Sequence, residues 1–336
     1  MDAEIAVIGA GVVGCATALA LARRDVSVVL LDAEEEPGLG ASGTNSGILH
    51  TGFDSPPGEL ETELILRSAA LRDSVLEALG VPVLRCGARL SPLDEQERPV
   101  AAGLAANARR NGVEVSLLGD GSLEVPGEAA TDPVAYTLAL AAAARRHGAE
   151  LRTSFQVAGL ERTNGSFVLH EAGGDSLRCR VTVNCAGLHA DEVARLAGDD
   201  SFEIYPRKGE FLVFDPPGDE PVARILLPVP SKRTKGVLVF PTLDGKVAAG
   251  PTAVDQDDKN DWSVRPEARD EILAKAAAMY PPLEDAQPIA AYAGLRPAGR
   301  GVNYLIGPSR ACPRLVNVAA IRSTGLTASL AIGERV

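Results

Sequence analysis

The feature that most restricts the fold is a glycine-rich turn near the N-terminus, Gly9-x-Gly11-x-x-Gly14. The apolar run Ile5-Ala6-Val7-Ile8 before it predicts a short buried strand, and the small residues of segment 12–24 after it predict a helix. Segment 26–31 predicts a second buried strand that ends at Asp32. The N-terminal segment therefore predicts a strand–turn–helix–strand unit.

Each residue of this turn has a physical role in binding a dinucleotide. Gly9 permits the tight turn, Gly11 lets the backbone approach a pyrophosphate at the helix N-terminus, and Gly14 lets helix and strand pack closely. Asp32 follows Gly14 by 18 residues and can accept hydrogen bonds from ribose hydroxyls. The alternative, a glycine-rich turn without a ligand, fits this flanking pattern less well.

The stretch Ile5 to Ala22 is free of charged residues and has the length of a membrane helix. However, Asp2 and Glu4 stand where a signal peptide carries basic residues, and the glycines weaken a continuous helix. The stretch is therefore interpreted as part of the folded core.

Length and charge exclude several classes of protein. A chain of 336 residues and 34.9 kDa exceeds what one hydrophobic core usually serves, which predicts two domains. The net charge of −12 and the pI near 4.9 oppose nucleic-acid binding. Five widely spaced cysteines without a C-x-x-C pair argue against a metal site and a disulfide framework, and free thiols favour the cytoplasm.

Three further turns decide between NAD and FAD. Residues 38–52 form a second loop rich in Gly, Ser and Asn, which offers backbone N–H donors to another part of a long ligand. Segment 181–187 predicts a buried strand that leads into a turn of small residues, and Thr324-Gly325-Leu326-Thr327 opens a last helix. Four such turns can line one long cofactor, which favours FAD. A plain surface loop is the alternative for residues 38–52.

Five segments resemble one family along nearly the whole chain. GAGVVG, GASGTNSGILHTGFDSPPG, VTVNCAGLHAD, YAGLRP and IRSTGLTASLAIGERV are similar, in this order, to FAD-dependent oxidoreductases of the D-amino-acid-oxidase (DAO) superfamily. Residues 206–211 and 229–253 most resemble glycerol-3-phosphate dehydrogenases of the anaerobic type. L-2-hydroxyglutarate oxidases share the NSGILHTG-like loop.

The turns and the resemblance together predict the residues that contact FAD. These are Gly9, Gly11, Val12, Val13, Gly14, Asp32, Ala33, Ala41, Ser42, Asn45, Ser46, Gly47, Val157, Cys185, Ala186, Gly187, Thr324, Gly325, Leu326 and Thr327.

The predicted fold is mixed α/β, with a Rossmann-like FAD-binding domain interleaved with an antiparallel-sheet substrate domain. Segments 203–214, 224–229, 236–241 and 246–250 predict strands, and Asp244-Gly245 predicts a hairpin between the last two. We expect the FAD-binding domain to comprise residues 1–80, 113–200 and 296–336, and the substrate domain residues 81–112 and 201–295.

The resemblance implies that arginines hold the substrate. Arg296, in Gly294-Leu295-Arg296-Pro297, matches the arginine that binds the substrate anion in the family's G-x-R-P-like motif, and a planar guanidinium pairs bidentately with a carboxylate or phosphate. Arg322 and Lys232 are further candidates for substrate binding. A solvated surface side chain is the alternative for each. Aerobic-type glycerol-3-phosphate dehydrogenases place a lysine where Gly325 stands here, which leaves phosphate recognition open.

His50 is the best candidate for a catalytic base, because it ends the loop expected to lie along the flavin. It resembles the flavin-proximal histidine of the hydroxyacid members. A histidine that merely packs against the ring is the alternative.

The expected reaction is FAD-dependent oxidation of a small anionic secondary alcohol by hydride transfer to flavin N5, with sn-glycerol 3-phosphate and dihydroxyacetone phosphate as substrate and product. The alternatives are L-2-hydroxyglutarate oxidation, an amino-acid or amine oxidase, and a nucleotide-binding module without activity. The sequence leaves open the electron acceptor (a quinone, oxygen or a partner protein), peripheral membrane association, the oligomeric state and covalent attachment of FAD.

Overall fold

The structure is a computed structural model that describes residues 1–163, 165–217, 221–231 and 235–336. Its elements in chain order are β1 (Ala3–Ile8), α1 (Val12–Ala22), β2 (Val28–Leu31), β3 (Ile48–Leu49), α2 (Leu60–Leu79), β4 (Val83–Leu84), β5 (Ala88–Leu90), α3 (Arg98–Arg110), β6 (Ser116–Leu117), β7 (Leu123–Val125), β8 (Ala129–Thr131), α4 (Pro133–Arg146), β9 (Glu150–Arg152), β10 (Val157–Thr163), β11 (Ser166–Glu171), β12 (Ser176–Asn184), η1 (Gly187–His189), α5 (Ala190–Leu196), β13 (Ile204–Phe214), β14 (Ile225–Leu227), β15 (Leu238–Pro241), β16 (Val247–Gly250), β17 (Val254–Asp255), α6 (Ala268–Met279), η2 (Pro281–Leu283), β18 (Ala290–Gly299), β19 (Leu305–Pro308), β20 (Leu315–Ala319) and α7 (Gly325–Arg335).

The first sheet contains the predicted N-terminal unit. Its strands run in the order β10-β11-β12-β1-β2-β9, and β20 joins it beside β12 and carries β19. The centre of this sheet is parallel and consists of β9, β2, β1, β12 and β20. The remaining strands, β10, β11 and β19, pair antiparallel. This parallel centre confirms the Rossmann-like part of the predicted fold.

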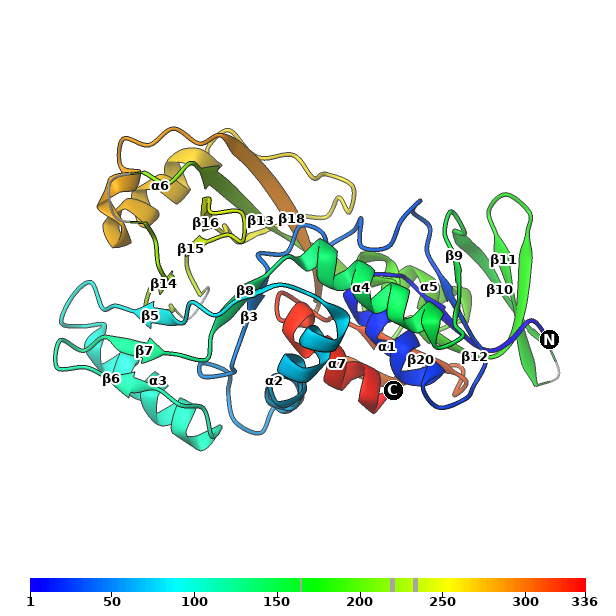
Figure 1. Cartoon of the computed structure of the whole chain (residues 1–336). Coiled ribbons are helices and arrows are strands. Elements are labelled where there is room, and N and C mark those ends of the chain that lie inside the picture. The colour runs from blue at the N-terminus through cyan, green and yellow to red at the C-terminus, as the bar shows by residue number, and fades with distance from the viewer. Residues whose placement is uncertain (164, 218–220, 232–234) are drawn as a thin grey trace.

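The two faces of the first sheet bury different partners. Val7 and Leu30 belong to the apolar cluster that includes the helices α1, α2, α4 and α7. Their chain neighbours Ala6 and Leu31 belong to a second cluster with residues of β11, β12 and α5. Because successive side chains of a strand point to opposite faces, near-continuous apolar strands are buried on both sides. Figure 1 shows α1, α2, α4 and α7 near the middle of the molecule.

The second sheet holds most of the predicted substrate domain. Its order is β17-β13-β16-β15-β14-β5-β7-β6, with β18 paired to β13, and it lies with α6 in the left part of Figure 1. The predicted hairpin is confirmed as β15 and β16, which pair antiparallel from Leu238↔Gly250 to Pro241↔Val247. One strand pair departs from the antiparallel pattern of this sheet, because β14 pairs with β5 in parallel. These two strands come from distant segments, so no hairpin turn sets their relative direction.

The strand pairing departs from the expected domain boundaries in two places. Residues 116–125, expected in the first domain, contribute β6 and β7 to the second sheet. Strand β18 continues in the second sheet as far as Gly299, past the expected boundary at residue 295. The division into domains itself stays a prediction.

A small third sheet connects the two larger ones. Its order is β3-β8-β4, and β3 pairs antiparallel with β8 through Ile48↔Ala130 and Leu49↔Ala129. This register places the residue after β3, His50, opposite the residue before β8, Glu128. Two loops that lie far apart in the sequence are therefore held together by two residue pairs.

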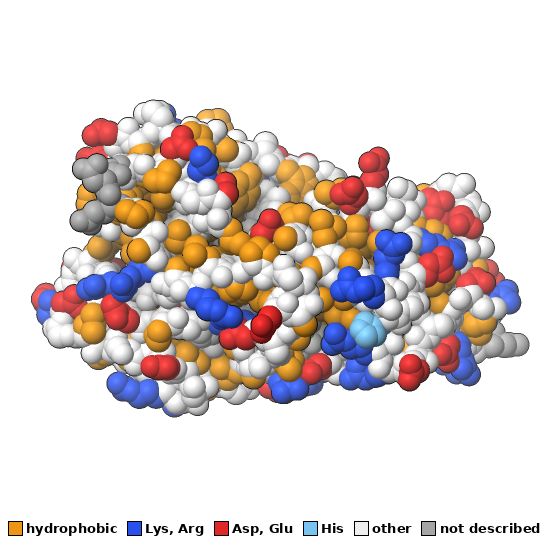
Figure 2. Space-filling model, viewed as in Figure 1, with side chains coloured by type: hydrophobic (Ala, Val, Ile, Leu, Met, Phe, Trp, Pro, Cys, Tyr) orange, Lys and Arg blue, Asp and Glu red, His pale blue; other side chains and the backbone are white. Residues whose placement is uncertain are grey.

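The surface mixes charged and apolar side chains. Figure 2 shows hydrophobic side chains across the middle of one face, with Lys, Arg, Asp and Glu distributed around them. Among the described residues, no helix combines the length and the apolar character that crossing a membrane requires.

Candidate active site

The turn between β1 and α1 is built on two glycines that lie against backbone. Gly9 has a φ of +100°, and a Cβ there would stand 2.4 Å from the carbonyl oxygen of Cys185. A Cβ on Gly14 would stand 1.8 Å from the carbonyl oxygen of Gly9. These distances exclude a side chain at both positions. The roles predicted for Gly9 in the turn and for Gly14 in helix packing therefore agree with the geometry.

The N-terminus of α1 is in contact with the second glycine-rich loop. Gly11 is the N-cap residue and supplies no side chain, and the N–H of Val12 donates to Ser42 Oγ at 2.9 Å. A Cβ on Gly11 would meet only Ser42 Oγ, at 3.0 Å. The first N–H groups of a helix have no partner within the helix and carry partial positive charge. This end of α1 is therefore suited to an anionic group such as a pyrophosphate.

Asp32 lies at the end of β2 beside this turn. Its Oδ2 accepts a hydrogen bond from the N–H of Ala10 at 2.5 Å, and its Oδ1 accepts one from the N–H of Glu34 at 2.9 Å. Burial raises the pKa of Asp32, while the hydrogen bonds from the Glu34 and Ala10 backbone act in the opposite direction. The carboxylate is thus fixed by the backbone and still lines the space next to the turn.

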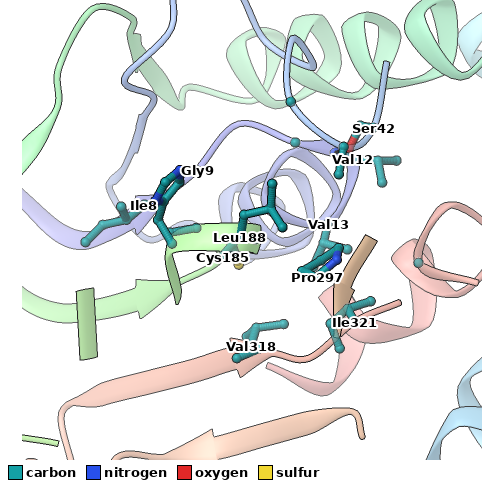
Figure 3. Close-up of a pocket in the computed structure, with 18 of the residues that line it drawn as sticks. Ile8, Gly9, Val12, Val13, Ser42, Cys185, Leu188, Pro297, Val318 and Ile321 are labelled. Carbon is teal, nitrogen blue, oxygen red and sulfur yellow. Dashed lines mark hydrogen bonds between the residues drawn. The ribbon is translucent and has the colours of Figure 1, made fainter. Parts of the chain in front are cut away.

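A cleft of about 660 Å³, here called the main cleft, brings the predicted turns together. Figure 3 shows Gly9, Val12, Ser42, Cys185, Pro297 and Val318 around it, from five separate parts of the chain. The predicted cofactor residues that line it are Gly9, Gly11, Val12, Val13, Asp32, Ala33, Ala41, Ser42, Asn45, Val157, Cys185, Ala186, Gly187, Gly325 and Leu326.

The other five predicted cofactor residues do not line the main cleft. Gly14 packs on Gly9, and Gly47 has a φ of +76° with no room for a Cβ beside the carbonyl of Thr131. Thr324 Oγ1 donates to Glu61 Oε1 at 2.6 Å, and the Oγ of Ser46 accepts from the N–H of Ile48 at 3.5 Å. Thr327 Oγ1 accepts from the N–H of His50 at 3.0 Å. These residues support the surrounding loops, and their contact with a cofactor stays a prediction.

Several residues that line the main cleft escaped the sequence analysis. Leu188 directly follows Gly187, so a longer turn would have included it. The segment 318–321 precedes Thr324 and reads as ordinary apolar strand. Lys259 and Trp262 come from the second sheet's loops, and no motif marks them. Lys259 Nζ is bound between Asp191 and Glu192, at 2.8 and 2.7 Å.

Arg296 lines the main cleft as a half-buried cation whose partners among the described residues are neutral groups. Its Nε donates to the carbonyl of Arg207 at 3.0 Å, and its Nη2 donates to the carbonyls of Lys208 and Thr252 at 3.0 and 2.7 Å. Within the described residues no carboxylate forms an ion pair with it. Burial lowers its pKa to about 10, and the charge of Arg207 acts in the same direction. An anion in the cleft would compensate this charge.

The other two predicted substrate residues differ in their surroundings. Arg322 also lines the main cleft, but its Nε donates to Asn303 Oδ1 at 3.0 Å and its Nη2 lies 3.6 Å from Glu61 Oε2. Its guanidinium therefore already has a partner carboxylate. Lys232 lies outside the described residues.

His50 faces a separate small space of about 30 Å³, here called the His50 cavity. Phe53, Asp54 and Lys235 also line it, and Lys235 Nζ lies 2.6 Å from Asp54 Oδ2. Burial opposes the ionisation of Asp54, but the charge of Lys235 holds the pKa of Asp54 below its usual range. The structure thus brings Arg296 and Arg322 together in the main cleft, whereas His50 lies beside a different cation.

The family model for the FAD-dependent oxidoreductases called DAO matches residues 4–336. The chain belongs to this family. FAD is therefore its cofactor, and the oxidation that it catalyses is FAD-dependent. The geometry fits this cofactor, because the N-terminus of α1, the glycine at its N-cap and the carboxylate of Asp32 all border one cleft.

The curated relatives of the chain are named for two kinds of hydroxy compound. The chain is 30% identical to glycerol 3-phosphate dehydrogenase of Caloramator mitchellensis, over 98% of this chain and 72% of the relative. It is 28% identical to glycerol 3-phosphate oxidase of Mycoplasma pneumoniae, over 98% and 92%. It is also 28% identical to human mitochondrial L-2-hydroxyglutarate dehydrogenase, but over 75% of this chain and 61% of that protein.

Two solved structures share the fold over nearly the whole chain. The FAD-bound, dithionite-reduced L-α-glycerophosphate oxidase of M. pneumoniae superposes with a TM-score of 0.92 at 26% identity, over 98% of this chain and 92% of that one. Glycine oxidase of Bacillus cereus superposes with a TM-score of 0.86 at 20% identity, over 99% and 93%, which shows a common fold alone.

The position of Gly11 leads to a first prediction about cofactor binding. A valine at this position would extend two methyl groups from the N-cap of α1, where a Cβ already meets Ser42 Oγ at 3.0 Å. We expect Gly11→Val to remove the close approach of a pyrophosphate and to yield colourless protein. Absorbance at flavin wavelengths, with circular dichroism to confirm folding, measures the effect. A folded Gly11→Val variant with a full complement of FAD would contradict this assignment.

Proposed function

We propose that this enzyme oxidises a small anionic secondary alcohol, and that sn-glycerol 3-phosphate is its substrate and dihydroxyacetone phosphate its product. The observation that carries the proposal is Arg296, a half-buried guanidinium in the main cleft whose described partners are all neutral carbonyl groups. A partly desolvated charge without a counter-ion is unfavourable, so a bound anion gains more there than at a fully solvated arginine. An anionic substrate is the ligand that this site favours.

The relatives support glycerol 3-phosphate over the alternatives. A relative named for glycerol 3-phosphate oxidation covers nearly the whole of both chains, whereas the L-2-hydroxyglutarate relatives match about three quarters of this chain. The structures named for amino acids lie below 25% identity and bear only on the fold. L-2-hydroxyglutarate is retained as the second candidate, because its carboxylates would meet the same guanidinium.

The proposed reaction assigns one role to each group of the chain. When bound, FAD would supply the two-electron acceptor for the hydride that leaves the carbon bearing the hydroxyl. His50 accepts the hydroxyl proton as the C–H bond breaks and the C=O bond forms, so the alcohol loses one hydride and one proton. Arg296 holds the anionic group and fixes the distance of the reacting carbon. Arg322 and Lys232 assist as further cations.

We propose the domain division of the sequence with two changes. Residues 116–125 and the end of β18 move to the substrate domain, because their strands pair within the second sheet. Arg296 then stands in the substrate domain, and the cofactor turns stand in the FAD-binding domain. We also propose a cytoplasmic location, which the five free cysteines support.

Reduction of the flavin without air tests the substrate class directly. We expect sn-glycerol 3-phosphate to bleach the flavin absorbance in anaerobic stopped-flow experiments, and L-2-hydroxyglutarate, glycine and L-proline to bleach it at least tenfold more slowly at equal concentration. Glycerol without phosphate serves as the uncharged control. Equal rates with glycerol and glycerol 3-phosphate would contradict the requirement for an anion.

Arg296→Lys tests the anion-binding role. Lysine keeps a positive charge but cannot retain the hydrogen bonds to three carbonyls and still present a donor to the cleft. We expect the KM for glycerol 3-phosphate to rise by a factor of roughly 10 to 1,000, the equivalent of about 1–4 kcal/mol for a charged hydrogen-bonded pair. Arg300→Lys, at an exposed arginine bound to Glu203, is the matched control. An unchanged KM would move the anion site elsewhere, with Lys235 beside His50 as the next candidate.

His50→Ala tests the proton acceptor. We expect the rate of flavin reduction at saturating substrate to fall by about 100-fold or more, because a positioned base contributes roughly 10²–10⁴ to the rate. The KM should change much less. His170→Ala, at a half-exposed histidine near Glu161, is the matched control. A His50→Ala enzyme that reduces its flavin as fast as the wild type at every pH would exclude the role.

A further inference from the structure

A buried carboxylate stands directly opposite His50. Glu128 precedes β8, and the pairing Leu49↔Ala129 sets it across from the residue that follows β3. Its side chain is fully buried, at 0% exposed, whereas the ring of His50 retains 18%. A buried carboxylate of this kind is retained only where donors compensate it.

The two carboxylate oxygens of Glu128 have different partners. Oε1 accepts two hydrogen bonds from Thr51, at 2.6 Å from its N–H and at 2.8 Å from its hydroxyl. Oε2 lies 3.1 Å from Nδ1 of the His50 ring. An ionised carboxylate oxygen can only accept a hydrogen bond, so a Glu128 carboxylate requires the proton of the Glu128–His50 contact on Nδ1. The other ring nitrogen, Nε2, then carries the lone pair.

Arg72 holds the two segments that carry His50 and Glu128 together, through hydrogen bonds that do not involve the Glu128 side chain. Its Nη1 donates to the carbonyls of Leu49 and His50 at 2.9 and 3.1 Å, and its Nη2 donates to the carbonyl of Gly127 at 2.5 Å. It thus ties the two loops together through their backbones. Glu128 contributes what Arg72 cannot, a negative charge directed at the imidazole.

We propose that Glu128 is the positioning residue of the proton acceptor: it holds the proton of His50 on Nδ1, leaves Nε2 free to accept the substrate's hydroxyl proton, and stabilises the imidazolium that results. This inference rests on the proposed role of His50 as the base. The arrangement has the logic of a carboxylate–histidine pair in hydrolases, where the carboxylate fixes the tautomer and itself stays unprotonated.

The other charged groups near His50 do not replace Glu128. Asp54 and Lys235, which share the His50 cavity, form an ion pair with each other at 2.6 Å. Arg72 donates to the carbonyl of His50 and is positive. Without the Glu128 charge, the Asp54–Lys235 pair would be neutral and Arg72 would leave a net positive charge around His50. A positive charge nearby opposes formation of an imidazolium.

The variant Glu128→Gln removes the negative charge and the acceptor that faces His50 but keeps a side chain of nearly the same size, so it tests charge and tautomer with little change in packing. The amide oxygen must accept the two Thr51 donors, so the amide NH₂ faces Nδ1 and forces the ring proton onto Nε2. We expect the rate of flavin reduction by glycerol 3-phosphate to fall by a factor of roughly 10² to 10⁴, with substrate affinity changed less than threefold. Glu124→Gln, at a partly exposed residue of the same segment bound to Arg224, is the matched control and should react like the wild type.

Nitrogen NMR of the ¹⁵N-histidine-labelled holoenzyme gives a readout that packing alone would not change. The chain has four histidines, and His50→Ala identifies the His50 signals by their absence. We expect the neutral Nδ1–H tautomer for His50 in the wild type and the Nε2–H tautomer in Glu128→Gln. Should Glu128→Gln fail to fold, the wild-type spectrum alone decides, because an Nε2–H tautomer there overturns the proposal.

The outcomes distinguish this inference from the proposed function. A slow His50→Ala enzyme together with a Glu128→Gln enzyme of wild-type rate overturns the positioning role and leaves the base in place. A His50→Ala enzyme of wild-type rate overturns the base itself, and the positioning role with it. Slow reduction in both variants, with the reversed tautomer in Glu128→Gln, supports both.

Discussion

The site depends on close contact between backbone segments that side chains would keep apart. A Cβ on Gly9 would clash with the carbonyl of Cys185, one on Gly14 with the carbonyl of Gly9, and one on Gly294 would stand 2.9 Å from the carbonyl of Thr44. The first two contacts bring β1, α1 and the turn after β12 together at one end of the main cleft. The third brings the second sheet against the glycine-rich loop. These backbone contacts fix the relative positions of the segments that line the cleft.

The two sheets divide the chemistry between them. The first sheet supplies the cofactor turns at the carboxyl ends of its parallel strands, as open α/β sheets generally do. The second sheet supplies Arg296 from β18, where Gly209 on the neighbouring strand leaves room for the guanidinium; a Cβ there would lie 2.9 Å from Nη2. The third sheet, which contains only short strands, carries His50 and Glu128. Its small size is compensated by Arg72, which bonds to three of its loop carbonyls.

The sequence predicts the parts of the site that follow from local chemistry. The turn at Gly9, the acidic residue at Asp32 and the hairpin around Asp244-Gly245 all follow from backbone geometry within a short stretch. The parallel pairing of β14 with β5 could not be predicted, because it joins segments more than a hundred residues apart. The same holds for Glu128: it is an isolated glutamate in the sequence, and only the two-residue register of β3 with β8 places it beside His50. That His50 and Arg296 border different cavities is likewise a property of tertiary packing.

Selection of an anion by this protein has to be a short-range effect. The chain carries a net charge of −12, so its overall field repels an anionic substrate at a distance. At physiological ionic strength this field decays within about 8 Å, and a ligand inside the cleft responds mainly to nearby groups. Lys259, which also lines the cleft, forms ion pairs with Asp191 and Glu192. Arg207, opposite Arg296 in the β13–β18 pairing, is paired with Asp255. Arg296 is hydrogen-bonded to backbone carbonyls and not to a carboxylate, so its positive charge remains available to an anion in the cleft. Because desolvation disfavours the charged form of Arg296, the ion pair with a bound anion is favourable for the anion and also favours the charged guanidinium.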